Sequence, residues 1–321
     1  MIQCGDYKIF IEDGLLGRLH DFIDIDKETI IITDSGIPEK YITKVESYFD
    51  NPLTLLLPQG EETKSIDVYK HLLEEIASRD YSRAAQIIAL GGGVVGDLAG
   101  FVAATYLRGV SFIQIPTSLL AQVDSSVGSK VAINHFRKNN VGTFYDPEVV
   151  LIDPTTLSTL SKRHYNNGMA EVIKYAFTLD KSLLLDIDNE NVNKIIEKCL
   201  SLKKYIVCKD PHDHHQRHIL NFGHTIGHAI EIHSHFNVLH GEAISIGMYK
   251  SIDYSLKGIL KEYLNKFNLP FTYDGDFTEI IRSDKKIRNE LIKVVRVKEI
   301  GKALIETIKL EEFLKGVEEI E

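Results

Sequence analysis

The amino-acid sequence predicts an α/β amino-terminal domain built on a parallel sheet, followed by a mainly helical carboxy-terminal domain. From residue 28 to residue 153, short apolar runs alternate with segments of helical periodicity, and this order is typical of a parallel sheet. After Asp153 and Pro154, long segments with helical periodicity largely replace the strand-like runs. We therefore expect two domains, residues 1–155 and residues 156–321.

Five apolar runs in the first half are interpreted as buried strands, because they are too short to form helices. They cover residues 29–33, 53–57, 86–90, 112–115 and 149–152. Two segments between them, 65–79 and 94–107, have the apolar spacing of helices.

The second half is expected to form helices over residues 168–179, 191–209, 219–233 and 241–255. Near its end, residues 291–297 and 303–308 predict a hairpin around Gly301.

The composition limits the classes of function that the chain can have. Hydrophobic residues make up 44% and charged residues 26%, so a large core can form. The net charge of −9, without a long Lys/Arg run, argues against general binding of nucleic acid. Neither a membrane-spanning run nor a secretory signal is visible. Three scattered cysteines suit a reducing compartment, and we expect a cytoplasmic location.

A glycine loop follows the third predicted strand and opens a helix. Residues 91–97 read Gly-Gly-Gly-Val-Val-Gly-Asp, which fits G-x-G-x-x-G, and this context predicts a pyrophosphate site in a Rossmann-like domain. A tight turn without a ligand is the alternative. Asp34 ends the first predicted strand and could bind a ribose, although it precedes the loop instead of following it. Asp97 could bind the cofactor or interact with the helix dipole.

Several histidines and one carboxylate indicate a metal site. His224 and His228 lie four residues apart, hence on one face of a helix, and His240 opens the next helical segment with Glu242. Imidazole and carboxylate ligands suit zinc or a similar cation. Glu171 is the best further ligand, because a carboxylate in so apolar a segment needs a partner. The pattern does not choose between His224 and His228, and most of the histidines that crowd into residues 212–240 are expected at the surface.

Polar side chains, most of them cations, recur inside otherwise apolar or glycine-rich segments. They are Arg108, Asp124, Lys130, Lys138, Asn139, Lys174, Lys203, Arg217 and Asn221. Buried cations need anionic partners, so a phosphorylated and carboxylated substrate would account for the set. The alternative is that each forms a structural ion pair or lies on the surface.

Together these motifs closely resemble the 3-dehydroquinate synthase family. The resemblance is carried by residues 91–109, 115–130, 138–139, 168–175, 220–231, 239–242 and 284–286, and it covers roughly residues 28–305. It implies a dehydroquinate synthase-like fold and a phosphate-eliminating cyclase, a carbon–oxygen lyase that forms 3-dehydroquinate from 3-deoxy-D-arabino-heptulosonate 7-phosphate in the shikimate pathway. It also implies NAD, Zn²⁺ with Co²⁺ as an alternative, and a homodimer.

The resemblance assigns roles to individual residues. The implied metal ligands are Glu171, His224 and His240. The implied NAD contacts are Asp34, Glu61, Lys64, Gly92, Gly93, Val94, Asp97, Thr117, Ser118, Lys138 and Thr159. The implied catalytic residues are Lys130, Lys174, Arg217, Asn221 and His228, the last on the substrate side. The implied substrate contacts are Arg108, Asp124, Asn139, Lys203 and Lys286, with Lys285 as an alternative to Lys286.

The chain departs from the family pattern at three places. Ser129 stands where a glycine is common, the loop 134–138 is one residue short, and Asp213 replaces a familiar glutamate. Three rival functions stay open. They are another sugar-phosphate cyclase (of the 2-deoxy-scyllo-inosose synthase or sedoheptulose 7-phosphate cyclase type), a glycerol-dehydrogenase-like alcohol dehydrogenase, and a metal-stabilised binding protein without activity.

Overall fold

The chain folds into two compact units, the first from Met1 to Ser161 and the second beginning at Lys162. The computed structural model describes residues 1–282 and 290–318. The division falls shortly after residue 155, where the sequence predicts the boundary, and just past the short helix Pro154–Thr159. Each unit is described separately below.

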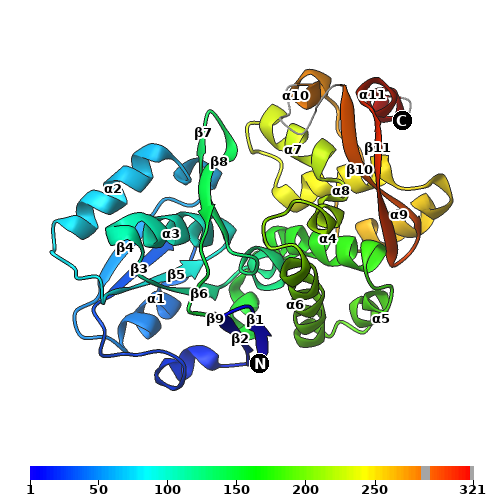
Figure 1. The fold of residues 1–321 in the computed structure, drawn as a ribbon. Helices are drawn as coiled ribbons and strands as arrows, with labels where there is room; N and C mark the ends of the chain where they lie inside the picture. Colours follow the sequence, from blue (N-terminus) through cyan, green and yellow to red (C-terminus); the bar gives the residue numbers. More distant parts are fainter. Residues whose placement is uncertain (283–289, 319–321) are drawn as a thin grey trace. The chain divides into compact units, whose positions relative to one another are not determined.

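A seven-stranded sheet forms the centre of the first unit (Figure 1), with strand order β1-β2-β9-β6-β5-β3-β4. Its strands are β1 (Ile2–Cys4), β2 (Tyr7–Ile11), β3 (Thr29–Asp34), β4 (Leu53–Leu57), β5 (Gln86–Gly91), β6 (Ser111–Pro116) and β9 (Val149–Ile152). The pairs are parallel except β1 with β2. The five expected strands are confirmed, whereas β1 and β2 were not expected.

Alternate residues of the central strands face opposite sides of the sheet and enter two separate cores. Ile30 and Ile32 pack into the core that contains α2 (Ile66–Ala77) and α3 (Gly93–Thr105). Ile31, between them, packs with Val45 of α1 (Glu39–Glu46). Both faces of the parallel sheet are therefore covered, which explains why its strands are continuous apolar runs.

The strand order positions the glycine loop. β4 pairs with one edge of β3 and β5 pairs with the other edge. The order in which successive strands join the sheet therefore reverses between β3 and β5. Ligands of open α/β sheets bind at such a switch point, beyond the carboxyl ends of the strands. Thr33 pairs with Leu90, which brings Asp34 beside Gly91 at the start of the loop.

A hairpin of β7 (Lys130–His135) and β8 (Arg137–Phe144) lies beside α3 and was not expected from the sequence. β8 is largely polar and exposed, so it lacks the apolar alternation that indicates a strand. Gly142 allows the two strands to approach, because a Cβ there would lie 2.3 Å from the Val131 carbonyl oxygen. The hairpin carries Lys130, Lys138 and Asn139, all implied site residues.

The second unit is mainly helical, and its helices expected over 168–179, 191–209 and 241–255 are confirmed with small shifts of their ends. Its elements are α4 (Lys162–Thr178), α5 (Leu183–Asp188), α6 (Val192–Lys209), α7 (His224–His233), α8 (His240–Ser251), α9 (Lys257–Lys266), α10 (Thr278–Arg282), β10 (Leu291–Glu299), β11 (Lys302–Lys309) and α11 (Leu310–Glu318).

One expected helix of the second unit, residues 219–233, is interrupted. A 3₁₀ turn over Gln216–Asn221 precedes Gly223, whose φ of 77° ends one segment before α7 begins. The hairpin around Gly301 is confirmed as β10 and β11, and the φ of 87° at Gly301 is the left-handed conformation that glycine adopts at no steric cost. Among the described residues, none of the helices is both long and apolar enough to cross a membrane.

Gly100→Ala is expected to destabilise the first unit. A Cβ at Gly100 would lie 2.4 Å from Val131 Cγ1 of the hairpin and 2.9 Å from Phe112 of β6, so α3 could not keep its present contacts with both. Overpacking costs about 1–3 kcal/mol, and the better helix propensity of alanine returns at most about 1 kcal/mol. Urea unfolding should show a net loss of up to about 2 kcal/mol in the free energy of unfolding.

Gly258→Ala in α9 is the matched control, because nothing lies within 4 Å of its added Cβ. This change should leave the unfolding free energy unaltered or raise it by up to about 1 kcal/mol. Equal changes in the unfolding free energy of the two variants would show that close packing around α3 does not require a glycine at position 100.

Candidate functional site

A fully buried carboxylate on α4 is the starting point of the site in the second unit. The Glu171 side chain has 0% of its surface exposed, and the ammonium of Lys174, one helical turn later, pairs with its Oε2. Burying a lone charge is costly, so both side chains need partners of opposite charge or strong polarity. α4 supplies one such partner in Lys174, which therefore forms the structural ion pair that the sequence left open as an alternative for this lysine.

Two imidazoles face the other oxygen of Glu171. His224 Nε2 lies 3.6 Å and His240 Nε2 lies 3.4 Å from Glu171 Oε1. The second ring nitrogen of each histidine is engaged elsewhere: His224 Nδ1 lies 3.0 Å from the Phe222 carbonyl oxygen, and His240 Nδ1 lies 3.2 Å from Glu231 Oε1. Both acceptors favour a proton on Nδ1, which leaves the Nε2 lone pairs directed at Glu171.

These three side chains fit a divalent metal. One ligand atom of each lies within 4.8 Å of the others. Ligands held about 2.0–2.1 Å from zinc at tetrahedral angles lie about 3.4 Å apart, close to the two observed nitrogen–oxygen separations. Two imidazoles and a carboxylate leave a fourth position open, as catalytic zinc sites do. The group could therefore hold Zn²⁺ or Co²⁺ with little rearrangement.

The structure distinguishes His224 from His228, a choice that the sequence pattern left open. The His228 ring lies 5.2 Å from that of His224 and 5.9 Å from that of His240, but His228 is not in the group around Glu171. Its side chain is 35% exposed, against 12% for His224. His228 is thus an accessible imidazole beside the cluster, which agrees with the substrate-side role that the resemblance implies.

Three contacts fix the beginning of α8, where His240 lies. Gly241 N donates to Asn167 Oδ1 at 2.5 Å, and a Cβ on Gly241 would lie 2.0 Å from the Asn167 carbonyl oxygen. Leu239 N donates to Glu242 Oε2 at 2.9 Å, and Arg163 binds both oxygens of Glu242 at 2.7 and 2.8 Å. Burial alone would raise the pKa of Glu242, but these hydrogen bonds outweigh it and lower that pKa. The ligand position on α8 is therefore tied to α4.

A loop between α6 and α7 holds Arg217, which is 4% exposed. Three backbone N–H groups of this loop donate to the carboxylate of Asp210. They belong to His214, His215 and Arg217, at 2.9, 2.6 and 3.1 Å. Burial raises the pKa of Asp210, but these donors outweigh it and hold the pKa well below its usual range. Arg217 Nη1 also donates to the Pro211 carbonyl oxygen at 2.9 Å. Asp210 thus fixes the backbone conformation of the loop that carries Arg217.

Other implied residues of the second unit are placed as follows. Lys203 on α6 is 6% exposed, and Asn221 lies at the end of the 3₁₀ turn, with its Nδ2 3.4 Å from His218 Nδ1. The other histidines between 212 and 235 are exposed or half-buried, which confirms that most are surface residues. Asp284, Lys285 and Lys286 lie outside the described residues.

The first unit brings its glycine loop against two serines. A Cβ on Gly92 would lie 3.3 Å from Ser118 Oγ, and one on Gly93 would lie 2.9 Å from Ser125 Oγ. The Thr117 N–H donates to the Gly91 carbonyl oxygen at 3.0 Å, which joins the ends of β5 and β6. Val94 follows in the first turn of α3. Such closely packed glycines before a helix N-terminus suit backbone contact with a pyrophosphate.

A charged network lies beside this loop. The Lys64 ammonium is 2.6 Å from Asp97 Oδ2 and 3.5 Å from Glu61 Oε1, and the Lys64 side chain is 3% exposed. Burial lowers the pKa of Lys64, but the two carboxylates outweigh it and raise the pKa. Asn134 Nδ2 donates to Glu61 Oε1 at 2.9 Å, which ties the network to β7. Asp97 lies beyond the first turn of α3, so the helix-dipole interpretation of this residue is wrong.

Asp34 and Thr159 have local partners. Asp34 is 9% exposed and accepts from Gly36 N at 2.7 Å, while Thr159 Oγ1 donates to the Thr156 carbonyl oxygen at 3.0 Å. Asp34 therefore stands at the carboxyl end of β3, next to the glycine loop. This position explains how an aspartate that precedes the loop in sequence lies beside it in space.

Several polar residues of the first unit are not buried, which favours for them the surface position that the sequence left open as the alternative. Arg108, Lys130 and Asn139 are exposed, and Asp124 and Lys138 are half-buried. Arg108 and Asn139 have φ values of 64° and 50°, in the left-handed region that is uncommon for such residues. Residues held in this region cluster at ligand sites, although strain by itself assigns no ligand.

Each of the three departures from the family pattern has a structural counterpart. Ser129 has a φ of 64°, which explains why glycine is common there, and its hydroxyl donates to Asp146 Oδ1. Asp213 also has a positive φ, of 59°. The short loop 134–138 forms the tip of the β7–β8 hairpin, where Phe136 is 96% exposed with a φ of 61°.

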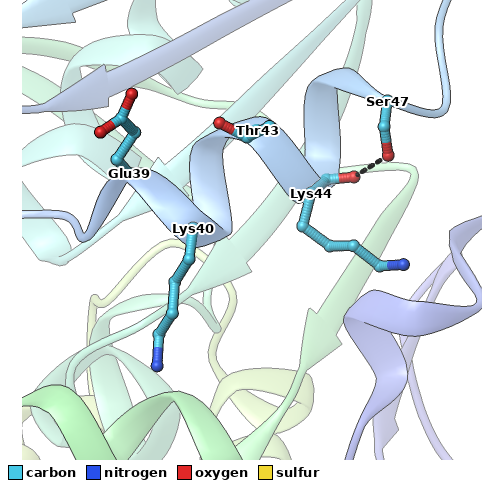
Figure 2. A pocket seen from close by; sticks show the side chains of 5 residues that line it. All are labelled: Glu39, Lys40, Thr43, Lys44 and Ser47. Carbon is cyan, nitrogen blue, oxygen red and sulfur yellow. Dashed lines mark hydrogen bonds between the residues drawn. The ribbon is translucent and has the colours of Figure 1, made fainter.

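Figure 2 shows from close by a hollow lined by residues of α1 and by Ser47, which directly follows that helix. They are Glu39, Lys40, Thr43, Lys44 and Ser47. The Ser47 hydroxyl donates to the Lys44 carbonyl oxygen at 2.8 Å, an ordinary bond within a helix end. The hollow contains none of the implied site residues, and its chemistry assigns it no role.

Comparison with known proteins agrees with this geometry. The family model for the 3-dehydroquinate synthase N-terminal part matches residues 54–167, and that for the C-terminal part matches residues 168–287. The 3-dehydroquinate synthases of Clostridium botulinum and Clostridium beijerinckii are each 42% identical to this chain. The alignments cover 96% of both chains for the first, and 98% of this chain and 99% of the relative for the second.

A solved structure of 2-deoxy-scyllo-inosose synthase, complexed with carbaglucose-6-phosphate, NAD⁺ and Co²⁺, superposes with a TM-score of 0.87 at 26% identity, covering 97% of this chain and 96% of that one. The fold and the histidine–carboxylate cluster thus define a sugar-phosphate cyclase. The two family models, which match residues of both units, narrow this class to one family. The chain belongs to the 3-dehydroquinate synthase family.

Four residues that position the site were not predicted from the sequence: Asn167, Arg163, Asp210 and Glu231. Glu231 lies in the apolar helix α7, the same signal that singled out Glu171, and could have been found by it. The other three residues, Asn167, Arg163 and Asp210, bind backbone groups or other side chains. No sequence pattern predicts such contacts.

Asp210→Ala is expected to lower the free energy of unfolding by about 2 kcal/mol near pH 7, since a hydrogen bond to a charged acceptor contributes about 1.5–3 kcal/mol. The pKa of Asp210 is lower in the folded protein than in the unfolded chain. Its stabilising contribution is therefore complete above the ordinary aspartate pKa of about 3.9 and is lost as the pH falls below it.

Urea unfolding of the wild type and Asp210→Ala near pH 7, 5 and 3 measures this contribution. The difference between the two proteins should be equal at the two higher pH values and smaller at the lowest, as the wild type loses its advantage. A difference that grows on acidification would contradict the role given to the Asp210 carboxylate.

Proposed function

We propose that this protein is a 3-dehydroquinate synthase, which converts 3-deoxy-D-arabino-heptulosonate 7-phosphate into 3-dehydroquinate and phosphate with the help of NAD and a divalent metal. The observation that carries the proposal is the group of Glu171, His224 and His240 in a chain of this family. Zn²⁺ is the metal we expect, with Co²⁺ as the alternative.

The two units have separate tasks in this proposal. The first binds NAD through the glycine loop, Asp34, and the network around Lys64. The second binds the metal and the anionic substrate. The 2-deoxy-scyllo-inosose synthase that shares the fold carries NAD⁺ and Co²⁺ in its crystal structure, which supports both cofactors here.

NAD at the glycine loop would supply a reversible hydride acceptor for a substrate alcohol, and a metal held by Glu171, His224 and His240 would supply Lewis-acid chemistry at the alcohol oxygen. The chain holds the substrate in the geometry that phosphate elimination and ring closure require, and this orientation supplies much of the rate. His228, an accessible imidazole beside the cluster, holds or moves a proton at the substrate.

Buried cations of the second unit bind the negative charges of the substrate. Asp210 holds the Arg217 backbone and Pro211 accepts from its Nη1, and a guanidinium is the group best suited to bind a carboxylate or phosphate with two hydrogen bonds. Lys203 adds a second buried ammonium, and Lys174 orients Glu171 by binding one of its oxygens. In the first unit, the resemblance implies substrate contacts at Arg108, Asp124 and Asn139, a catalytic role for Lys130, and an NAD contact for Lys138.

The rivals make different predictions about products. A cyclase for glucose 6-phosphate or sedoheptulose 7-phosphate has no carboxylate to bind, and the identity to the inosose synthase is lower than that to 3-dehydroquinate synthases. An alcohol dehydrogenase would release NADH in proportion to substrate. A binding protein without activity would form neither phosphate nor NADH.

Phosphate release from each candidate sugar phosphate, with catalytic NAD and added Zn²⁺, tests the proposed function. We expect release from 3-deoxy-D-arabino-heptulosonate 7-phosphate, with many turnovers for each NAD and no net absorbance of NADH. Release from another sugar phosphate alone, or NADH formed in equal amount to product, would contradict the proposal.

Substitutions test the metal ligands separately from the substrate-side imidazole. His224→Ala and Glu171→Ala should lose bound metal and lower activity by at least about 100-fold, because a ligand is removed outright. His228→Ala should lower turnover by about 100-fold or more while retaining one equivalent of metal. Metal analysis of the purified variants and phosphate release measure both properties.

Gly258→Ala, whose added Cβ has nothing within 4 Å, is the control for metal or activity lost during purification. Metal retained by His224→Ala and lost from His228→Ala would reverse the two assignments. A homodimer and a cytoplasmic location stay predictions, and sedimentation of the purified protein tests the first.

A further inference from the structure

His240 is unusual in the cluster because a carboxylate faces each of its ring nitrogens. Nε2 lies 3.4 Å from Glu171 Oε1, and Nδ1 lies 3.2 Å from Oε1 of Glu231, a residue of α7. The Glu231 side chain is only 3% exposed. His224 differs, since its Nδ1 faces the neutral carbonyl oxygen of Phe222. One of the two imidazoles therefore has a buried negative charge behind it.

A carboxylate behind a ligating histidine has a known physical effect. It accepts the Nδ1 proton, fixes the ring orientation and the tautomer, and makes the opposite nitrogen a better electron donor to a cation. A neutral carbonyl oxygen fixes the tautomer but adds no charge. The contribution of Glu231 to metal binding should therefore exceed that of the carbonyl group behind His224.

We propose that Glu231 is a positioning residue, which holds His240 in the metal-binding tautomer and strengthens its bond to the ion. This inference rests on the proposed metal ligands Glu171, His224 and His240. Glu231 does not touch the ion, and it acts through His240. Its place on α7 links the helix of His224 to the helix of His240 through a part-buried hydrogen bond.

The other contact of Glu231 does not compete with this role. Its Oε2 lies 4.0 Å from His228 Nε2, beyond hydrogen-bond distance. His228, Glu231 and His240 also form a second group of close ligand atoms. A cation in that second group would compete with the contact between His240 Nδ1 and Glu231 Oε1. The hydrogen-bonded arrangement involves no such competition.

Two substitutions separate the charge of Glu231 from its hydrogen bond. Glu231→Gln keeps an oxygen that can accept from Nδ1 but removes the charge, and Glu231→Ala removes both. The control is Asp186→Asn, which alters a carboxylate on α5 that is similarly buried and paired with Lys194 and Lys198. It reports the general cost of neutralising a buried, ion-paired carboxylate in this unit.

The measurements are Zn²⁺ affinity, from competition with a chromogenic chelator, and the visible absorption of the Co²⁺-loaded protein. Loss of a carboxylate behind a metal-bound histidine weakens binding by about 10–100-fold. We expect about 10-fold weaker binding for Glu231→Gln, a loss nearer 100-fold for Glu231→Ala, and a changed Co²⁺ spectrum in both. Asp186→Asn should bind Zn²⁺ like the wild type. Thermal unfolding without metal shows that each variant is folded.

Affinities of both Glu231 variants within twofold of the wild type would overturn the inference. An equal loss of Zn²⁺ affinity in Asp186→Asn would also overturn it. The same holds if the wild type binds two equivalents of Zn²⁺ and the Glu231 variants lose only the second. Failure of the proposed metal ligands is recognised separately: the wild type would then bind no stoichiometric Zn²⁺, or His224→Ala would bind it as tightly as the wild type.

Discussion

A carboxylate without exposed surface, Glu171 on α4, is the constraint around which the second unit is arranged. An ion in this position is tolerated only if cations or strong dipoles surround it, because leaving it uncompensated costs several kcal/mol. Lys174 on the same helix binds one oxygen, and His224 and His240 bring their Nε2 atoms to the other. The histidines come from two further helices, so three helices must meet at this carboxylate.

The close approach of α7 and α8 makes that meeting possible. A Cβ on Gly223 would lie 2.7 Å from the Met248 backbone nitrogen, and one on Gly247 would lie 2.0 Å from the Gly223 carbonyl oxygen. The two helices therefore pack almost backbone to backbone, with their histidines on adjoining turns. Contacts from Asn167 and Arg163 then fix the start of α8 against α4. Ligand positions fixed in this way suit a site in which small displacements reduce activity.

Much of this arrangement follows from the sequence, because buried strands and helices have strong apolar periodicity and the glycine loop has a fixed motif. The hairpin that carries Lys130 and Lys138 was not predicted, since polar, exposed strands lack that periodicity. The distinction between His224 and His228 also required the structure. Both lie on one face of α7, and only the position of α4 determines which of them meets Glu171.

Anomalous diffraction at the zinc edge from crystals of the Zn²⁺-loaded protein tests the central claim most directly. The account predicts one strong peak within about 2.0–2.2 Å of Glu171 Oε1, His224 Nε2 and His240 Nε2. His240 Nδ1 should at the same time keep its hydrogen bond to Glu231. A peak bound by His228, or one located among the surface histidines near Asp210, would contradict the account.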